Sequence, residues 1–144
     1  MLKRILIGGF ILLVAGIGIY LYIASEKFAD TQNRKSAYTV NALDFIKEFQ
    51  ENNSAANKKY ADKIITVNGR VSEVEPADTT MNIKFIDTAT GAYVIFAFQE
   101  QHLAEAKTVK VGESISIKGS FSSGVYSEIL GTIFITFKRS ALNK

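Results

Sequence analysis

The segments Ile65-Thr66-Val67-Asn68-Gly69-Arg70-Val71-Ser72 and Ile115-Ser116-Ile117-Lys118-Gly119-Ser120-Phe121-Ser122 decide the fold. In both segments apolar residues alternate with polar ones, and a glycine stands in the same place of the pattern. Alternation with a period of two predicts strands with one buried face. Glycine allows the sharp bend that strands of a small closed barrel need. We therefore expect two strands of a single barrel that bend in the same way at their glycines, and not a duplicated domain.

Three further strands are predicted from alternation or from short apolar runs, at Met81–Phe85, Tyr93–Phe98 and Ile129–Phe137. Val74 breaks the alternation of the first strand, so a bulge or bend is expected between Val71 and Val74. A short helix is expected within residues 101–109. Five strands with a helix between the third and the fourth have the element order of an OB-fold, a five-stranded Greek-key barrel. The expected fold class is therefore mainly β.

Ahead of the barrel, apolar residues recur at three-residue steps in a stretch rich in Glu, Lys, Gln and Ala: Val40, Leu43, Ile46 and Phe49. This spacing predicts an amphipathic helix that packs one face on the barrel. The helix is expected to be capped by Asn41 or Thr39 and to run to about Tyr60.

The stretch from Ile5 to Ala24 carries no charge. At about 1.5 Å per helical residue it spans roughly 30 Å, the thickness of the hydrocarbon core of a bilayer. Because Lys3 and Arg4 precede it, the amino terminus is expected inside and the rest of the chain outside. A cleaved signal peptide is the alternative, but a cut after Ala24 would place Tyr22 where a small residue is required.

These readings divide the chain into four parts. We expect a transmembrane anchor over residues 1–25, a polar tether over 26–39, an OB-fold domain with its helix over 40–138 and a polar tail over 139–144. The expected location is the inner (cytoplasmic) membrane, as a single-pass protein whose OB domain lies on the periplasmic or outer side.

A set of motifs in the soluble part carries a resemblance: Ala56-Asn57-Lys58-Lys59-Tyr60, then Lys63, Val67-Asn68-Gly69, Gly112 and Ile115-Ser116-Ile117-Lys118-Gly119. With them, residues 38–137 resemble the tRNA-anti-like OB-fold family of small bacterial envelope proteins. The resemblance implies a membrane-tethered OB domain with a helix before its first strand, and implies little about a ligand. Many members look like lipoproteins, whereas this sequence has no cysteine, which favours a protein span over a lipid anchor.

The sequence predicts no catalysis, no cofactor and no metal site. His102 is the only histidine and cysteine is absent, so a serine or threonine nucleophile would lack a positioned base. No acidic loop has calcium spacing, and no phosphate-binding glycine motif is present. We expect His102 to have a surface or helix-capping role.

Single-stranded nucleic acid is the alternative ligand that the fold class suggests, because OB-folds bind it by aromatic stacking along a basic groove. Between Asp44 and Phe137, however, nine basic residues stand against twelve acidic ones. The two expected binding loops, Glu75–Thr80 and Ser122–Glu128, carry no basic residue. Phosphate binding without a basic patch lacks its main driving force, so this function is disfavoured.

A non-catalytic module that binds an envelope protein or a glycan is the remaining hypothesis, since OB-folds also bind oligosaccharides. Its candidate contact residues project from the relevant strands and loop between buried positions: Arg70, Lys84 and Tyr126, with Asn68 and Asn82 as hydrogen-bonding neighbours. Ordinary solvated barrel surface would show the same residue types. An exposed edge at Tyr93–Phe98 is a further expected site, for pairing with a partner strand.

Overall fold

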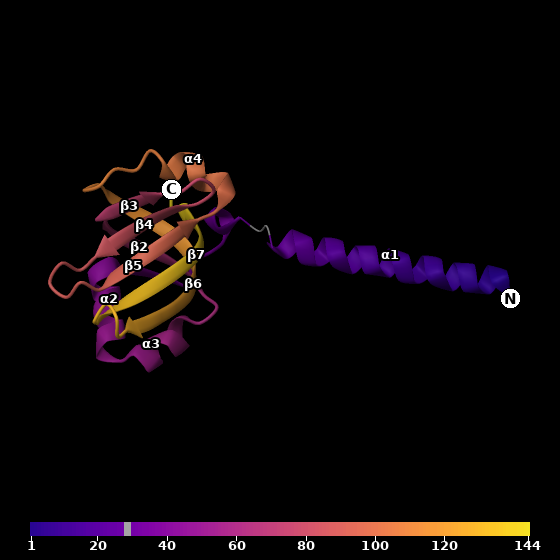
Figure 1. Cartoon of the computed structure of the whole chain (residues 1–144), viewed down its shortest axis with the longest axis horizontal. Helices are drawn as coiled ribbons and strands as arrows, with labels where there is room; N and C mark the ends of the chain where they lie inside the picture. Colours follow the sequence, from indigo (N-terminus) through magenta and orange to yellow (C-terminus); the bar gives the residue numbers. More distant parts are fainter. Residues whose placement is uncertain (28–29) are drawn as a thin grey trace. The chain divides into compact units, whose positions relative to one another are not determined.

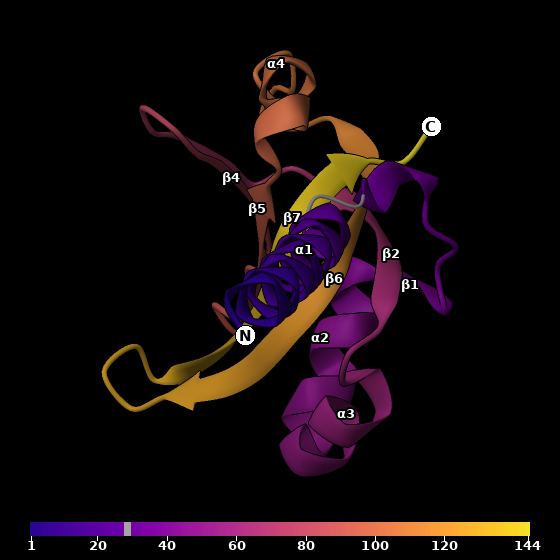
Figure 2. The ribbon, with the colours of Figure 1, turned by 90° about the vertical axis from the view of Figure 1, so that its right-hand side faces the viewer.

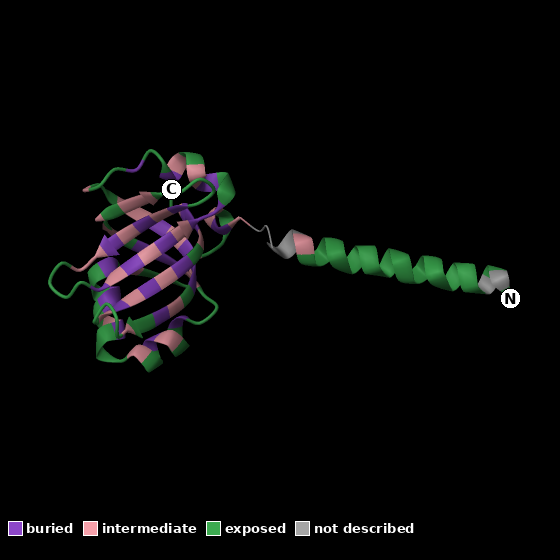
Figure 3. Cartoon of the chain, in the orientation of Figure 1, coloured by how far each residue is buried: buried purple, intermediate pink, exposed green. Residues whose placement is uncertain are grey.

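The computed structural model describes residues 1–27 and 30–144, and the chain forms two compact units, Met1–Asp30 and Thr31–Lys144 (Figure 1). The first unit contains helix α1 (Leu2–Lys27). Its stretch Ile5–Ala24 has a mean hydropathy of 2.3 and no buried residue (Figure 3). The expected apolar helix is thereby confirmed, and it is long enough to cross a membrane, although a signal sequence would have the same features.

Within the described residues, the second unit contains one mixed sheet of seven strands: β1 (Tyr38–Asn41), β2 (Ile64–Arg70), β3 (Glu73–Pro76), β4 (Met81–Ile86), β5 (Tyr93–Phe98), β6 (Ser114–Ser127) and β7 (Thr132–Leu142). The strand order is β1-β2-β6-β7-β5-β4-β3. The pairs β1–β2 and β5–β7 are parallel, and the other neighbours are antiparallel. Buried and half-buried residues alternate along the strands, as Figure 3 shows.

The expected five-stranded closed barrel was wrong in strand number and in closure. The first expected strand is divided into β2 and β3, which stand near opposite ends of the sheet order. Between them the Val71 N–H donates to the Glu113 carbonyl at 2.8 Å, whereas the Ser72 N–H donates to the Lys84 carbonyl at 2.9 Å. The chain therefore leaves one neighbour for another at the expected bend, and the ladder of strand pairs stays open.

The extra strand β1 begins in the last two residues of the segment expected to be a tether and ends in the expected domain. A short 3-10 helix, η1 (Thr31–Asn33), precedes β1, and both belong to the compact unit that begins at Thr31. Positions 28 and 29 of the expected tether lie outside the described residues. At the other end of the chain, β7 continues to Leu142 and so covers most of the segment expected to be a polar tail.

The single expected helix is two helices, α2 (Ala42–Glu51) and α3 (Asn53–Tyr60). Asn52 separates them because its backbone is extended, with φ −154° and ψ 89°. Its N–H donates to the Glu48 carbonyl at the end of α2, and its side-chain oxygen accepts from the Ala55 N–H at 3.0 Å. Asn41 caps the start of α2, as expected, by accepting from the Leu43 N–H.

The core lies between α2 and the concave side of the sheet. Phe45, Ile46 and Phe49 of α2 are fully buried, and the Phe45 ring lies 4.9 Å from the Tyr60 ring and 5.9 Å from the Phe137 ring. A Cβ at Gly69 would stand 2.7 Å from the Phe85 ring, and one at Gly124 would overlap the Phe49 ring. These glycines are therefore needed because a helix and aromatic rings approach the strands closely.

Two further expectations about the strands were also wrong. Strand β6 runs through the Ser-Ser-Gly segment expected to be a loop, and the turn to β7 lies at residues 128–131 (Figure 2). Strand β5 is not an edge, because β4 and β7 flank it. The short helix expected within 101–109 is confirmed as α4 (Leu103–Ala106), which follows a 3-10 turn, η2 (Glu100–His102).

Candidate ligand groove at the end of β2

A groove of about 1030 Å³ opens where β2 ends. Four pieces of chain line it: residues 41–43 around the start of α2, residues 68–72 around the end of β2, Phe85 and Ile86 at the end of β4 with Thr88 after it, and residues 111–116, apart from Glu113, around the start of β6. The pairing of β1 with β2 ends at Asn41 and Asn68, because the chain turns into α2 at Ala42. Strand β2 continues to Arg70 without β1 beside it, and the groove opens there. We name this site the β2–β6 groove.

Arg70 carries the charge of the β2–β6 groove. Its Nε donates to the Gly112 carbonyl at 2.9 Å. Gly112 has a φ of +93°, a left-handed conformation that glycine adopts without steric cost. No other charged residue lines the groove within the described part of the chain. The guanidinium is therefore held against the groove wall by its inner nitrogen, and Arg70 as a whole is an exposed residue.

Neutral polar side chains stand beside Arg70. In the pairing of β2 with β6, Asn68 lies opposite Ser116 and Arg70 lies opposite Ser114. Asn68 and Ser114 are exposed, and their side chains make no hydrogen bond within residues 1–27 and 30–144. The groove thus offers an amide, hydroxyl groups and one cation to a ligand.

Two of the five candidate contact residues, Asn68 and Arg70, therefore lie in the β2–β6 groove, and the other three do not line it. Asn82 stands on β4 opposite Ala97. Lys84, also on β4, donates to Glu75 at 2.5 Å and to Glu73 at 3.2 Å. Burial alone would lower the pKa of Lys84, but its hydrogen bonds with the two carboxylates raise it. Lys84 is thus a neutralised member of a surface ion-pair cluster.

Tyr126 lies at a different place. It lines a smaller hollow of about 380 Å³ together with Gln50, Thr90 and residues 131–133. Near it, the tip of the β6–β7 hairpin exposes apolar side chains, with Ile129 96% and Leu130 57% exposed. Tyr126 is 57% exposed and projects from β6 rather than from the loop where it was expected.

The motif that carries the family resemblance has a structural role. Asn57 of α3 donates from Nδ2 to the Gly124 carbonyl at 2.8 Å, and its Oδ1 accepts from the Gly124 N–H at 2.9 Å. This two-way bond, which we call the Asn57–Gly124 clamp, fixes α3 to β6. Ala56 and Tyr60 of the same motif are buried in the core. The motif therefore identifies the way the helix docks, and not a ligand site.

Tyr60 and Lys59 converge on one carboxylate at the surface of α2. The Tyr60 hydroxyl donates to Glu48 at 2.6 Å, and Lys59 Nζ donates to the other Glu48 oxygen at 2.7 Å. Burial alone would raise the pKa of Glu48, but the hydrogen bonds from Lys59 and Tyr60 outweigh it and lower that pKa. The hydrogen bond with Glu48 raises the pKa of Lys59, and burial raises the pKa of Tyr60.

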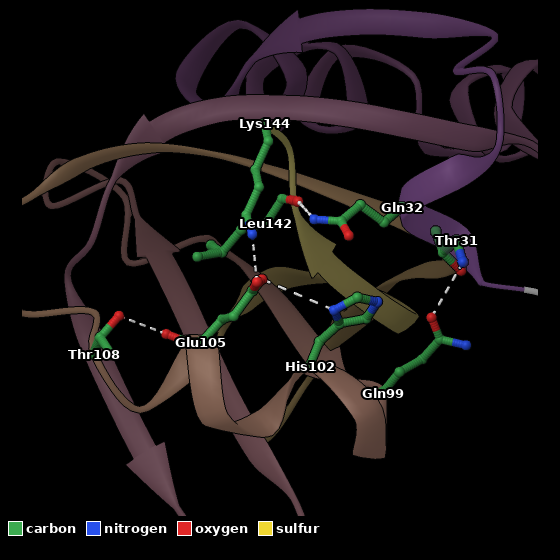
Figure 4. A network of polar contacts seen from close by, with 8 residues as sticks. All are labelled: Thr31, Gln32, Gln99, His102, Glu105, Thr108, Leu142 and Lys144. Carbon is green, nitrogen blue, oxygen red and sulfur yellow. Dashed lines mark hydrogen bonds and ion pairs between the residues drawn. The ribbon is translucent and has the colours of Figure 1, made fainter.

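His102 was expected at the surface, and this was wrong. Only 6% of the residue is exposed, and it makes no side-chain capping bond to α4. Figure 4 shows it in a network near the end of β7. Its Nδ1 lies 3.9 Å from Glu105, to which Lys144 Nζ donates at 2.5 Å. Gln99 in the same region accepts from the Thr31 N–H. The network ties η1, η2, α4 and the end of the chain together.

Most of the β2–β6 groove was not foreseen from the sequence. Leu43, Val111, Thr88, Ser114 and Ser116 were not among the candidates. The sequence did contain one indication of the groove. The two segments that share the glycine-containing pattern form β2 and β6, which pair with each other so that Gly69 lies opposite Ile115. That register places Asn68 and Arg70 beside Ser116 and Ser114. The contributions of Leu43 and Val111 come from a helix start and a loop, which strand patterns do not position.

Taken together, the mixed sheet and the helix that covers its core define a small OB-type domain that follows an apolar helix in the sequence. The chain belongs to the tRNA_anti-like family, whose model matches residues 1–130. The resemblance expected from the sequence is thereby confirmed. No curated protein sequence matches the chain significantly.

The chain is similar to solved structures at low sequence identity. A lipoprotein from Klebsiella pneumoniae, described provisionally as nucleic acid-binding, is 17% identical with a TM-score of 0.57, over 73% of this chain and 91% of that one. An OBody bound to hen egg-white lysozyme is 15% identical with a TM-score of 0.45, over 60% of this chain and 87% of that one. At 17% identity the likeness to the Klebsiella pneumoniae lipoprotein shows the fold alone.

Proposed function

We propose that this protein is a non-catalytic binding module, anchored by α1 in the inner membrane with its OB-type domain on the outer side. In this proposal the β2–β6 groove holds an envelope ligand, either a protein or a glycan. The observation that supports it is the lining of the groove, which combines amide and hydroxyl groups with the single cation of Arg70. Such a lining suits a ligand of low charge density.

The same lining supports a module without catalysis. Serine residues line the groove, but neither a histidine nor a carboxylate lines it within the described residues. A hydroxyl nucleophile needs an adjacent base within hydrogen-bond reach. His102, the one imidazole in the sequence, belongs instead to the network with Glu105 and Lys144.

Site-specific photo-cross-linking in intact cells tests the proposal. A photoreactive residue replaces Ser114, which is exposed in the groove, and the matched control replaces Lys138, which is exposed on β7 outside it. We expect a discrete adduct from position 114 that is absent from position 138, with mass spectrometry identifying protein or sugar. Equal labelling at both positions, or no adduct at 114, would contradict a ligand in the groove.

One observation favours the alternative, a single-stranded nucleic acid. On the outer side of the sheet, Tyr93 and Phe134 stack with ring centres 6.0 Å apart, and Lys84 Nζ lies 5.3 Å from the Tyr93 ring centre. Stacked aromatic rings are what bases bind on OB domains. The adjacent cation is paired with Glu73 and Glu75, however, so it offers little charge to phosphates.

Titration of the full chain with a labelled single-stranded oligonucleotide at two salt concentrations separates the two functions. We expect no binding tighter than about millimolar at low salt, because counterion release requires several unpaired cations. Tight binding that weakens steeply with salt and is lost in Tyr93→Ala would establish the alternative.

A further inference from the structure

We propose that the β2–β6 groove recognises the free carboxyl end of an extended peptide that carries an apolar side chain next to that end. This inference rests on the proposed function and names the class of ligand within it. Three features of the groove carry it: the fixed guanidinium of Arg70, the exposed apolar side chains of Leu43 and Val111, and the neutral hydrogen-bonding groups between β2 and β6.

Arg70 is arranged to receive a carboxylate. A guanidinium has five N–H donors in a rigid fork. The bond from Nε to the Gly112 carbonyl uses one of them and fixes the plane of the group. The outer nitrogens have no ion pair or hydrogen bond with other described residues. A carboxylate accepts two parallel hydrogen bonds from such a fork, and this is the strongest arrangement for the pair.

Within the part of the chain that the structure describes, no carboxylate lines the groove or pairs with Arg70. Glu113 and Asp87 flank lining residues in the sequence. Glu113 accepts from the Lys110 N–H at 3.2 Å, and Asp87 accepts from the Ala89 N–H and the Thr90 hydroxyl. Neither carboxylate lines the groove. The charge of Arg70 is therefore complemented by an anion supplied from outside.

Leu43 and Val111 distinguish a peptide from a sugar. Both line the groove, and 57% and 64% of their surfaces are exposed. Large apolar side chains exposed in a concave site gain stability when another apolar group covers them. A polyphosphate would need more than one cation, and a hydrophilic glycan would leave these two side chains in water. A peptide supplies the carboxylate and the apolar group together.

The remaining polar groups fit the main chain of such a peptide. The side chains of Asn68 and Ser114 lie next to Arg70 on β2 and β6, and both lack intramolecular partners within the described residues. An amide donates and accepts, and a hydroxyl does the same. They can therefore satisfy a peptide N–H and C=O that would otherwise lose their hydrogen bonds to water on binding.

The test uses the full chain in nanodiscs and a library of random hexapeptides with a free carboxyl end, alongside the same library with an amidated end. Peptides enriched on the wild type are remeasured on Arg70→Gln, on Leu43→Ser and on Lys138→Gln, the last removing an exposed charge outside the groove. Thermal unfolding checks that each variant folds. Arg70→Lys tests the fork, because lysine keeps the charge without the planar donors.

We expect enriched carboxyl-ended peptides with apolar residues near the end, and about tenfold or more loss of affinity on amidation and in Arg70→Gln, as for a hydrogen bond to a charged group. Leu43→Ser should weaken the same peptides, and Lys138→Gln should bind as the wild type does. Equal enrichment of the two libraries, or equal binding by Arg70→Gln, would overturn the inference.

The outcomes separate the inference from the proposed function. A cross-linked ligand at position 114 without carboxylate preference would keep the groove as a binding site and remove the peptide as its ligand. Absence of both would remove the groove as well.

Discussion

At the scale of single residues, Gly124 is where helix, strand and core meet. Its backbone holds Asn57, and its missing side chain leaves room for the Phe49 ring. In Gly124→Ala the new Cβ would overlap that ring, so we expect the free energy of unfolding to fall by about 1–3 kcal/mol, as in overpacked cores. Urea unfolding measures the change. Ser122→Ala, at an exposed position of the same strand, is the control, and an equal effect there would contradict the steric cause.

Glu48 gives the protein a pH-dependent contribution to stability. Because its pKa is lower in the folded state than its usual value, the contribution is present above the unfolded pKa and is lost as the pH falls through the folded pKa. Glu48→Gln should therefore be less stable than the wild type at pH 7, by under about 1 kcal/mol for a partly exposed cluster. The difference should vanish well below pH ~4, as measured by unfolding at several pH values. A difference that is constant from pH 3 to 7 would mean that the charge has no role.

At the scale of elements, Asn52 ends one helix and begins the next. Its side chain caps α3 by accepting from the Ala55 N–H. Asn52→Ala removes the cap and should lower the free energy of unfolding by about 1 kcal/mol. Asn52→Ser keeps an N-cap oxygen and should recover most of that loss. Equal destabilisation by alanine and serine would show that the cap is not the cause.

Strands with one buried face were predictable, and strands at the margins of the sheet were not. The core of β2 and of β4 and the run of β5 were evident from period-two or continuous apolar patterns, which reflect burial directly. β1 has exposed residues at three of its four positions, and β3 carries Glu73, Glu75 and Pro76, so neither shows such a pattern. The second half of β6 was hidden because Ser122, Ser123 and Gly124 are typical of loops. At Gly124 the strand needs a glycine, because Phe49 of α2 packs directly against its backbone.

At the scale of the whole molecule, the sequence identified the apolar helix, the family and the bend between β2 and β3, because each rests on local spacing. The groove depends on where β1 stops and α2 starts beside β2, which is a property of the assembled sheet. Only two of its lining residues, Asn68 and Arg70, were therefore among the candidates. Burial of His102 likewise arises from packing of η2 and α4 against the end of β7.

The proposed anchor makes its own prediction. The full chain should stay in the membrane fraction after carbonate extraction, and its mass should include residues 1–24. Leu13→Lys, in the middle of the apolar stretch, should impair insertion because a central lysine costs about 2.5–3.5 kcal/mol. Thr39→Lys, at an exposed position of β1, should insert normally. A soluble product that begins after Ala24 would identify a cleaved signal peptide instead.

The Asn57–Gly124 clamp joins residues 67 positions apart. A contact so distant along the chain closes a long loop, and such contacts form late in folding. During synthesis α2 and α3 are complete well before β6 has been made, so the rings of Phe49 and Tyr60 lack the Phe121 ring of β6 against which they pack. During synthesis the domain therefore passes through a stage with exposed aromatic rings. Such a stage is prone to aggregation, and it is the stage at which chaperones are most needed.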